Sequence, residues 1–300
     1  MIQLLAELKG REFAGFEERL MEMEIPSWTI REDRVHHLVD LIGYFDSEEE
    51  GIKSYNSIRG QFPNLPERPA ISPVLDRDWK EAYKDHFRPW FIGNLHWVPL
   101  WLKGQYPLPR GSRAVFLDPG MAFGTGNHET TRLCAARLVE LAQEWESGLP
   151  ERSVIDAGCG SGILAISAVK LGFGKVSGFD IDSEAVKVSQ ENAAANGVSA
   201  ALTLRTCGLE EGLAHQTADL VVANILANVL SQNAAILLGS VNPGGRLVLS
   251  GIMAREVGDV KSIFESQARN LWGACDARSR IDGEWADVFI SRPGRLPQRP

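Results

Sequence analysis

The stretch "VIDAGCGSGILAIS", residues 154–167, decides the fold of this 300-residue chain. A short apolar run typical of a buried strand leads into Gly158, Gly160 and Gly162, and an apolar helical pattern follows directly. Glycines permit the tight turn between such a strand and helix, and the turn leaves backbone N–H groups facing outward where the helix begins. The spacing G-x-G-x-G lacks the third glycine of the dinucleotide fingerprint at its usual offset, which favours a nucleoside over a pyrophosphate ligand. The stretch therefore predicts a cofactor site, and a plain strand-to-helix turn is the alternative.

Near-continuous apolar runs alternate with helical patterns from residue 152 onward. Apolar runs separated by amphipathic helices are typical of a parallel sheet that is covered on both faces. The expected strands are 152–158, 175–182, 218–226, 245–252 and 285–291, and the expected helices between them are 163–172, 183–197, 226–239 and 255–268. The pattern predicts an α/β fold with a Rossmann-like sheet and helices on both faces.

Two acidic residues end the second expected strand, "VSGFDID". Asp180 follows the glycine turn by about twenty residues, where a carboxylate can accept hydrogen bonds from both hydroxyls of a ribose. Asp182 lies on the same strand face, but it also directly precedes a helical pattern that it could cap. We therefore assign Asp180 to a ribose and favour the N-cap for Asp182.

Asn224 ends the next apolar run, "ADLVVAN". In an open α/β sheet the carboxyl ends of the strands face the ligand crevice, so its amide would accept and donate hydrogen bonds in the site. The alternative is that Asn224 caps a helix beginning at Ile225. The glycine turn and Asp180 together favour the site.

The composition limits the classes of partner. The formal net charge of -8 argues against a broad basic face for nucleic acid and suits a basic protein partner better. The four cysteines are widely spaced and the histidines have no spaced cysteine or acidic partners, so we expect free thiols and no metal site. No window approaches the roughly 20 apolar residues of a membrane span, and the first residues do not resemble a secretory signal, so we expect a cytoplasmic protein.

The rest of the chain divides by composition. Residues 1–73 alternate short strand and helix patterns, which predicts a small α+β domain that ends in a proline-rich stretch. Residues 74–105 hold half of the eight tryptophans, and the first half of this segment predicts a helix. Its rings either pack a linker against the following domain or form a wall of a cleft between domains. We expect the α/β domain over 106–292 and a disordered tail over 293–300.

The stretch "LDPGMAFGTGNHETT", residues 117–131, precedes a helical pattern and contains three glycines. So pliable a backbone is typical of a loop that changes shape around a ligand, and a surface loop with a helix cap is the alternative. His128 in this loop is a candidate proton acceptor, because imidazole exchanges protons near neutral pH. A hydrogen bond from the ring to its own backbone is the alternative for this residue.

Together the glycine turn, "GFDID" and Asn224 resemble the class I S-adenosylmethionine-dependent methyltransferases. The loop "LDPGMAFGTGNHETT" and "NILANVL" are similar to motifs of the PrmA-type ribosomal protein lysine methyltransferases, and the similarity covers nearly the whole chain. The resemblance implies a class I methyltransferase domain, S-adenosylmethionine as cofactor, and a ferredoxin-like N-terminal domain that recognises the substrate. The residues it implies in cofactor contact, with Gly160 added from the turn itself, are Thr131, Gly158, Gly160, Asp180 and Asn224.

The implied reaction is methyl transfer to lysine side-chain or N-terminal amines of a large-subunit ribosomal protein at the base of the stalk. The carbonyl oxygen of Asn224 would hold the amine hydrogens, and His128 would accept the proton. No direct contact with nucleic acid or membrane is expected. Two rival hypotheses stay open: a related methyltransferase that acts on another protein or a small amine, and a catalytically silent module that binds the cofactor.

Overall fold

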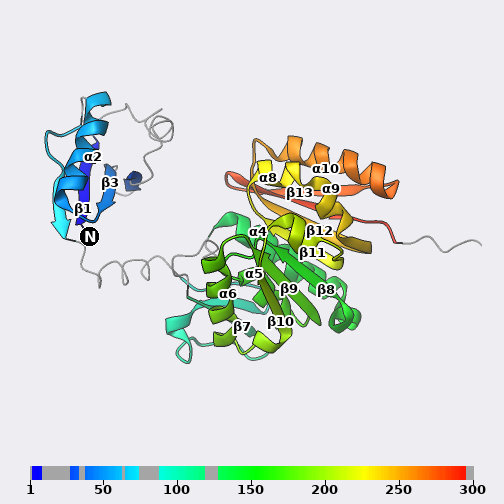
Figure 1. The fold of residues 1–300 in the computed structure, drawn as a ribbon. Helices are drawn as coiled ribbons and strands as arrows, with labels where there is room; N and C mark the ends of the chain where they lie inside the picture. The colour runs from blue at the N-terminus through cyan, green and yellow to red at the C-terminus, as the bar shows by residue number, and fades with distance from the viewer. Residues whose placement is uncertain are drawn as a thin grey trace, which may run out of the picture. The chain divides into compact units, whose positions relative to one another are not determined.

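The computed structural model describes residues 2–8, 28–33, 38–62, 65–73, 88–118 and 128–294 (Figure 1). The chain divides into two compact units, Met1–His86 and Phe87–Pro300. Several predictions lie outside the described residues: the helix in the first half of the aromatic segment, the glycine-rich part of the loop at 119–127, and the end of the tail at 295–300. Pro293 is described, and its carbonyl accepts a hydrogen bond from Gly244 N at 3.1 Å.

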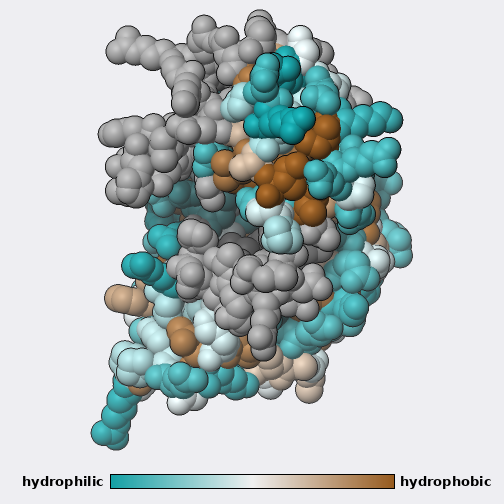
Figure 2. All heavy atoms as spheres, turned by 90° about the vertical axis from the view of Figure 1, so that its left-hand side faces the viewer, coloured by the Kyte–Doolittle hydropathy of each residue, from teal (hydrophilic) through white to brown (hydrophobic). Residues whose placement is uncertain are grey.

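Hydrophilic side chains predominate among the described residues on the face shown in Figure 2. No helix within the described ranges is long and apolar enough to cross a membrane. On the face shown in Figure 2, hydrophobic side chains gather in one small group, and most of the remaining described surface is hydrophilic. The large hydrophobic side chains with the greatest exposure include Ile181 at 81% and Leu226 at 67%. Both lie beside the glycine turn and line the same cavity as Gly158.

The first unit is a four-stranded sheet with a helix against it. Its elements are β1 (Ile2–Leu8), β2 (Trp28–Asp33), β3 (Leu38–Phe45), α2 (Glu48–Gln61) and β4 (Ala70–Pro73). The strand order is β2-β3-β1-β4, and all pairs are antiparallel. Ser47 caps α2 by accepting a hydrogen bond from Glu50 N, and Leu4, Leu41 and Tyr55 are fully buried in the core. The α+β elements are confirmed where they are described, and the ferredoxin-like arrangement stays a prediction because residues 9–27 lie outside that part.

A seven-stranded sheet organises the second unit, in the order β10-β9-β8-β11-β12-β14-β13. The strands are β8 (Ser153–Ala157), β9 (Lys175–Asp180), β10 (Leu202–Thr206), β11 (Ala218–Asn224), β12 (Val241–Met253), β13 (Asp276–Asp282) and β14 (Trp285–Ser291). The first five strands in the sheet are parallel, whereas β14 pairs antiparallel with both β12 and β13. The predicted α/β fold with a Rossmann-like sheet is confirmed. The sheet is mixed, because a short hairpin joins β13 to β14 at its edge in place of another crossover helix.

Helices cover both faces of this sheet (Figure 1). They are α4 (Glu129–Glu144), α5 (Ile163–Leu171), α6 (Ser183–Ala195), α7 (Leu209–Leu213), α8 (Ala227–Gln232), α9 (Ala234–Gly239) and α10 (Val257–Trp272), with 3-10 turns at Leu100–Leu102, Glu146–Glu151 and Ser199–Ala201. The single helix predicted over 226–239 is two helices, because the chain leaves helical geometry at Asn233.

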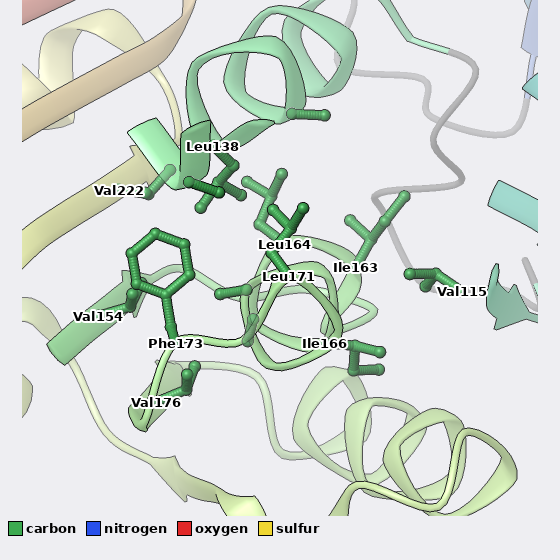
Figure 3. Close-up of a cluster of buried hydrophobic side chains, with 14 of the residues drawn as sticks. Val115, Leu138, Val154, Ile163, Leu164, Ile166, Leu171, Phe173, Val176 and Val222 are labelled. Carbon is green, nitrogen blue, oxygen red and sulfur yellow. The ribbon is translucent and has the colours of Figure 1, made fainter. Parts of the chain in front are cut away.

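The buried residues follow the two-residue period of the strands. Val154 and Val222 belong to the cluster under α4 and α5, whereas their neighbours Ile155 and Val221 belong to the cluster on the opposite face. Figure 3 shows the first cluster, where Leu138, Leu164 and Phe173 come together with valines of the strands. On a sheet with both faces covered, side chains on both sides of a strand are buried and are therefore mostly apolar, which is why the sequence runs were nearly continuous.

The second half of the aromatic segment forms a small sheet of β5 (Trp90–Ile92), β6 (Leu95–Pro99) and β7 (Arg113–Leu117). Trp90 stacks on Trp97 with ring centroids 3.9 Å apart, and the fully buried Trp97 donates a hydrogen bond to Ser167 Oγ at 2.9 Å. The interpretation that these rings pack against the α/β domain is therefore confirmed for Trp90 and Trp97.

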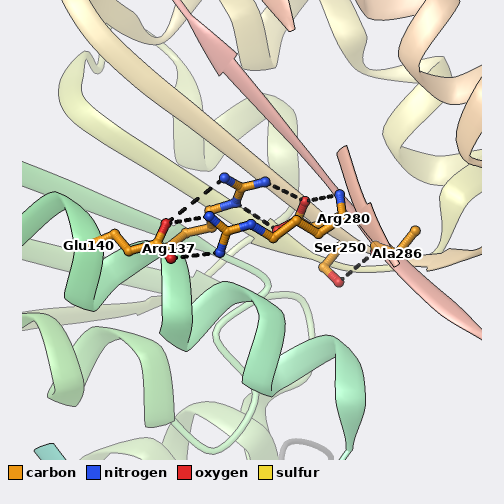
Figure 4. Close-up of polar contacts among 6 residues, drawn as sticks. Arg137, Glu140, Ser250, Arg280 and Ala286 are labelled. Carbon is orange, nitrogen blue, oxygen red and sulfur yellow. Dashed lines mark hydrogen bonds and ion pairs between the residues drawn. The ribbon is translucent and has the colours of Figure 1, made fainter. Parts of the chain in front are cut away.

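A buried ion pair joins α4 to the antiparallel edge of the sheet (Figure 4). Arg137 donates two hydrogen bonds to the carboxylate of Asp287, at 2.7 and 2.8 Å, and both side chains are almost fully buried. Asp287 also accepts from Arg280 N, and the Arg280 guanidinium in turn makes two bonds of 2.7 Å to Glu140. The planar guanidinium matches a carboxylate with two parallel bonds, so this contact fixes orientation as well as distance.

Asp287→Ala should lower the free energy of unfolding by about 3–5 kcal/mol, because it leaves the Arg137 charge buried without its partner. Glu140→Ala is the matched control: it removes a half-exposed carboxylate from the same network and should cost no more than about 1 kcal/mol. Urea unfolding of the three proteins measures both losses. Equal losses would mean that the buried pair adds nothing beyond a surface contact.

Candidate functional site

The glycine turn lies at the carboxyl end of β8. Gly158, Gly160 and Gly162 all have positive φ angles, of 81°, 51° and 79°, which other residues adopt only with strain. The backbone N–H groups of Gly158 and Cys159 both donate to Phe179 O at 2.9 Å, so the turn is attached to the neighbouring strand β9.

Asp180 connects this turn to the end of β9. Its Oδ2 accepts a hydrogen bond from Gly160 N at 2.9 Å, and its Oδ1 accepts one from Asp182 N at 3.1 Å. Each carboxylate oxygen can accept a further hydrogen bond, which leaves both able to bind a ligand. Asp182 is the N-cap of α6 and accepts from Glu184 N at 2.9 Å, so the predicted cap is confirmed.

Asn224 ends β11 but caps no helix. The next helix begins at Ala227 with Leu226 as its cap, so the capping alternative for Asn224 was wrong. Its Nδ2 donates to Thr131 Oγ1 at 3.4 Å, while its Oδ1 is buried and has no hydrogen-bond partner among the described residues. A buried acceptor without a partner costs about 1–3 kcal/mol, so this oxygen is available for a donor that arrives with a ligand.

His128 is the N-cap of α4. Its Nδ1 lies 2.9 Å from Thr130 Oγ1 and 3.4 Å from Thr130 N, so the alternative of a local hydrogen bond is confirmed. The imidazole also meets the indole of Trp285 edge to face, with centroids 4.7 Å apart and an interplanar angle of 66°. The proton-acceptor role of His128 stays a prediction.

Two adjoining cavities lie at this edge of the sheet. The first, of about 510 Å³, is lined by His128, Thr130, Gly158, Gly160, Asp180, Asp182, Ala185, Asn224, Ile225, Leu226, Gly251 and Trp285. The second, of about 620 Å³, is lined by Gly158, Phe179, Asp180, Ile181, Gly208, Leu209, Glu210, Glu211, Ile225, Leu226, Val229 and Asn233. Gly158 and Asp180 line both, so the two cavities meet at the glycine turn.

Most of the candidate residues are brought together here. His128, Gly158, Gly160, Asp180 and Asn224 line the first cavity. Thr131 does not line it: its side chain is fully buried and reaches the cavity only through its contact with Asn224.

Sequence reasoning missed Trp285, which also lines the first cavity. Because β14 runs antiparallel to β12, its first residue lies at the edge where the parallel strands end. An isolated tryptophan at the start of an apolar run was the available signal, but the direction of the strand is not visible in the sequence.

Asp156, in β8, was also missed. Its Oδ2 accepts from Ala165 N at 3.0 Å, whereas its Oδ1 is buried without a hydrogen-bond partner among the described residues. Burial raises the pKa of Asp156 from 3.8 to about 7. The hydrogen bond from Ala165 lowers this pKa, and the negative charge of Asp180 raises it by a smaller amount. In the described part of the chain, no group of three His, Cys, Asp or Glu residues could hold a metal ion.

The fold and the site define a class I methyltransferase. The family model described as ribosomal protein L11 methyltransferase (PrmA) matches residues 4–292, and the chain belongs to this family. A "Ribosomal protein L11 methyltransferase" of Azotobacter vinelandii is 44% identical over 204 residues, which are 67% of this chain and 65% of that protein. One of Pelobacter propionicus with the same description is 35% identical over 98% of this chain and 95% of its own length. The crystal structure of a ribosomal protein L11 methylase from Lactobacillus delbrueckii subsp. bulgaricus is 32% identical, covers 67% of this chain and 96% of its own, and has a TM-score of 0.56.

Membership of this family implies S-adenosylmethionine as the methyl donor, and the residues present fit it. A glycine-lined turn lets a ligand approach the backbone, and Asp180 has acceptor capacity for ribose hydroxyls. Asn224 Oδ1 has no donor among the described residues, so it can accept one from a ligand. The exposed apolar side chains of Ile181 and Leu226 line the second cavity and suit the faces of a flat base.

Gly158→Ala should weaken binding of S-adenosylmethionine about tenfold or more, because the new Cβ would overlap Ile225 Cγ2 in the cavity wall. Gly197→Ala is the matched control, since Gly197 also has a positive φ, of 68°, but has open space around its Cβ position. Both variants should lose about 1 kcal/mol of stability from backbone strain. Calorimetric affinities that fall equally in both would assign the effect to strain alone.

Stability should depend on pH through Asp156. Its pKa is higher in the folded protein, at about 7, than the ordinary value of 3.8, so the folded state holds an extra proton between these values. The contribution of Asp156 is therefore fully present below about pH 4 and is lost as the pH rises towards 7, at up to about 1.4 kcal/mol per pH unit. Between pH 5 and pH 8 the wild type should lose more stability than Asp156→Asn in urea unfolding. Parallel pH profiles would contradict a raised pKa.

Proposed function

We propose that this protein transfers methyl groups from S-adenosylmethionine to amines of ribosomal protein L11, on lysine side chains, the N-terminus or both. The observation that carries the proposal is Asn224, a residue that lines the first cavity next to the glycine turn and whose buried Oδ1 has no hydrogen-bond partner among the described residues. An amide oxygen in this position accepts an N–H of an amine without protonating it. The relatives described as ribosomal protein L11 methyltransferases support the choice of substrate.

The cofactor would lie across the two cavities that share Gly158 and Asp180. Asp180 would bind the ribose hydroxyls, and the second cavity would hold the base between apolar side chains. Gly158 and Gly160 would allow the remainder of the cofactor to approach the backbone. Thr131 would not touch the cofactor. Its hydroxyl accepts a hydrogen bond from Asn224 Nδ2 and would so orient the amide with Oδ1 towards the ligand.

When bound, S-adenosylmethionine supplies a methyl group on a positively charged sulfur. The substrate nitrogen uses its lone pair to form a bond to the methyl carbon while the carbon–sulfur bond breaks and leaves its electron pair on sulfur. The nitrogen then loses a proton to water or to His128. Asn224 aligns the amine for this displacement, and such alignment contributes much of the acceleration available to a two-substrate reaction.

The domains would divide the work. Residues 1–73 would recognise the protein substrate, 74–105 would connect the domains, 106–292 would carry out the transfer, and 293–300 would form a tail. The net charge of -8 favours a basic protein partner in the cytoplasm over a direct contact with nucleic acid.

Mass spectrometry of purified large-subunit ribosomal proteins, incubated with this protein and labelled S-adenosylmethionine, tests the proposal. Label on L11 in multiples of one methyl group is the expected result. Label on another protein would support methyl transfer as the reaction but would show that L11 is not the substrate. No label anywhere, with cofactor binding intact by calorimetry, would overturn the ribosomal substrate.

Two substitutions should separate the roles in this assay. Asp180→Ala should weaken cofactor binding by about 1.5–3 kcal/mol, the usual range for hydrogen bonds to a charged group. Asn224→Ala should lower turnover more than cofactor affinity. Asp182→Ala is the control next to Asp180: as the loss of an N-cap it should cost about 1 kcal/mol of stability, with a smaller effect on affinity. The reverse pattern for Asn224 would make it a cofactor contact only.

A further inference from the structure

Trp285 lines the first cavity together with the predicted amine contact, Asn224. The cavity has Asn224 on the parallel strand β11 and Trp285 at the start of the antiparallel strand β14. Trp285 is partly exposed, so an indole surface faces the cavity rather than the core.

One contact to the ring and one anchor on its strand position Trp285. The His128 imidazole packs against it at 4.7 Å, and His128 is itself held as the cap of α4. Two residues along β14, Asp287 is locked to Arg137 of α4 by two short hydrogen bonds. The same helix therefore contacts the ring through its N-cap residue and holds the ring's strand through Arg137 in its middle.

Asn224 and Trp285 offer opposite chemistry to an amine. The Asn224 oxygen needs an N–H donor, and a neutral primary amine has two, a secondary amine one and a tertiary amine none. An indole face instead attracts methyl groups that surround a positive nitrogen. Each methyl group that is added therefore weakens the contact with Asn224 and strengthens the contact with Trp285.

We propose that Trp285 is a specificity-determining residue, which receives the methylated amine and so sets how many methyl groups the site adds to one nitrogen. The inference rests on the proposed function. Asn224 governs the first transfer, and Trp285 governs retention of the amine for the later ones. In each transfer a nitrogen–carbon bond forms, and the carbon–sulfur bond breaks with its electron pair on sulfur. After the first and second transfers the nitrogen loses a proton to water, and after a third transfer it has no proton to lose.

The test compares wild type, Trp285→Leu and Trp285→Phe in their methylation of L11. Trp285→Leu should leave the rate of the first transfer within about threefold and shift the products towards fewer methyl groups per nitrogen, as measured by mass spectrometry. Trp285→Phe should restore much of the higher methylation, because a smaller aromatic face remains. Trp272→Leu is the matched control: Trp272 lies on α10, does not line either cavity, and should leave the product distribution unchanged.

A binding measurement keeps the inference separate from the choice of substrate. Tetramethylammonium chloride, titrated by calorimetry into the protein with S-adenosylhomocysteine, should bind roughly 5- to 30-fold more weakly to Trp285→Leu than to wild type. If tetramethylammonium binding depends on Trp285 but L11 is not methylated, the role of Trp285 in binding the methylated amine is supported and L11 is ruled out as the substrate. Methylation of L11 with the same product distribution in Trp285→Leu would overturn the inference and leave the proposed function standing. An equal affinity of both proteins for tetramethylammonium would also overturn it.

Discussion

The site depends on the close packing of Ile225 between two glycines. A Cβ at Gly158 would overlap the Ile225 side chain, and a Cβ at Gly251 would overlap the Ile225 backbone. Gly158 follows β8 and Gly251 lies in β12, so the carboxyl ends of three neighbouring strands approach more closely than ordinary residues allow. Ile225 N also donates to Ser250 O at 3.2 Å. These contacts restrain Ile225 and with it the backbone of the preceding Asn224, which lines the first cavity.

The antiparallel edge gives the site its second wall. A parallel sheet ends its strands at the crevice, so a residue that begins a strand would lie at the opposite edge. Reversal of β14 brings the first residue of a strand to the crevice, and this residue is Trp285. The reversed strand is joined to α4 by a buried Arg137–Asp287 pair, although apolar packing would often be as stable. Such a pair has one bonding geometry, so it holds the wall in a defined position.

Local chemistry determined which features the sequence could predict. The glycine turn and the Asp182 cap depend on residues close together in the chain, and the structure has both as predicted. Asp180 ends β9 and bonds to the turn, while its ribose contact stays a prediction. Strands β10 and β13 were missed because they lie at the sheet edges, and β13 (Asp276–Asp282) is almost wholly exposed and so has no apolar period. Trp285 and the Arg137–Asp287 pair depend on the direction of β14, which no local pattern encodes.

Two buried oxygens without partners among the described residues lie at or beside the site: one in Asn224, which lines the first cavity, and one in Asp156, which lines neither cavity. Asp156 lies in β8 and Asn224 at the end of the adjacent strand β11, and each has one such oxygen. The carboxyl group of Asp156 can relieve its burial by holding a proton, which is the meaning of its pKa near 7. The amide of Asn224 does not titrate in this range, so protonation cannot remove its cost. None of the described residues satisfies Asn224 Oδ1. A donor brought by a ligand would satisfy it, and binding of that donor would recover a desolvation cost that folding has imposed.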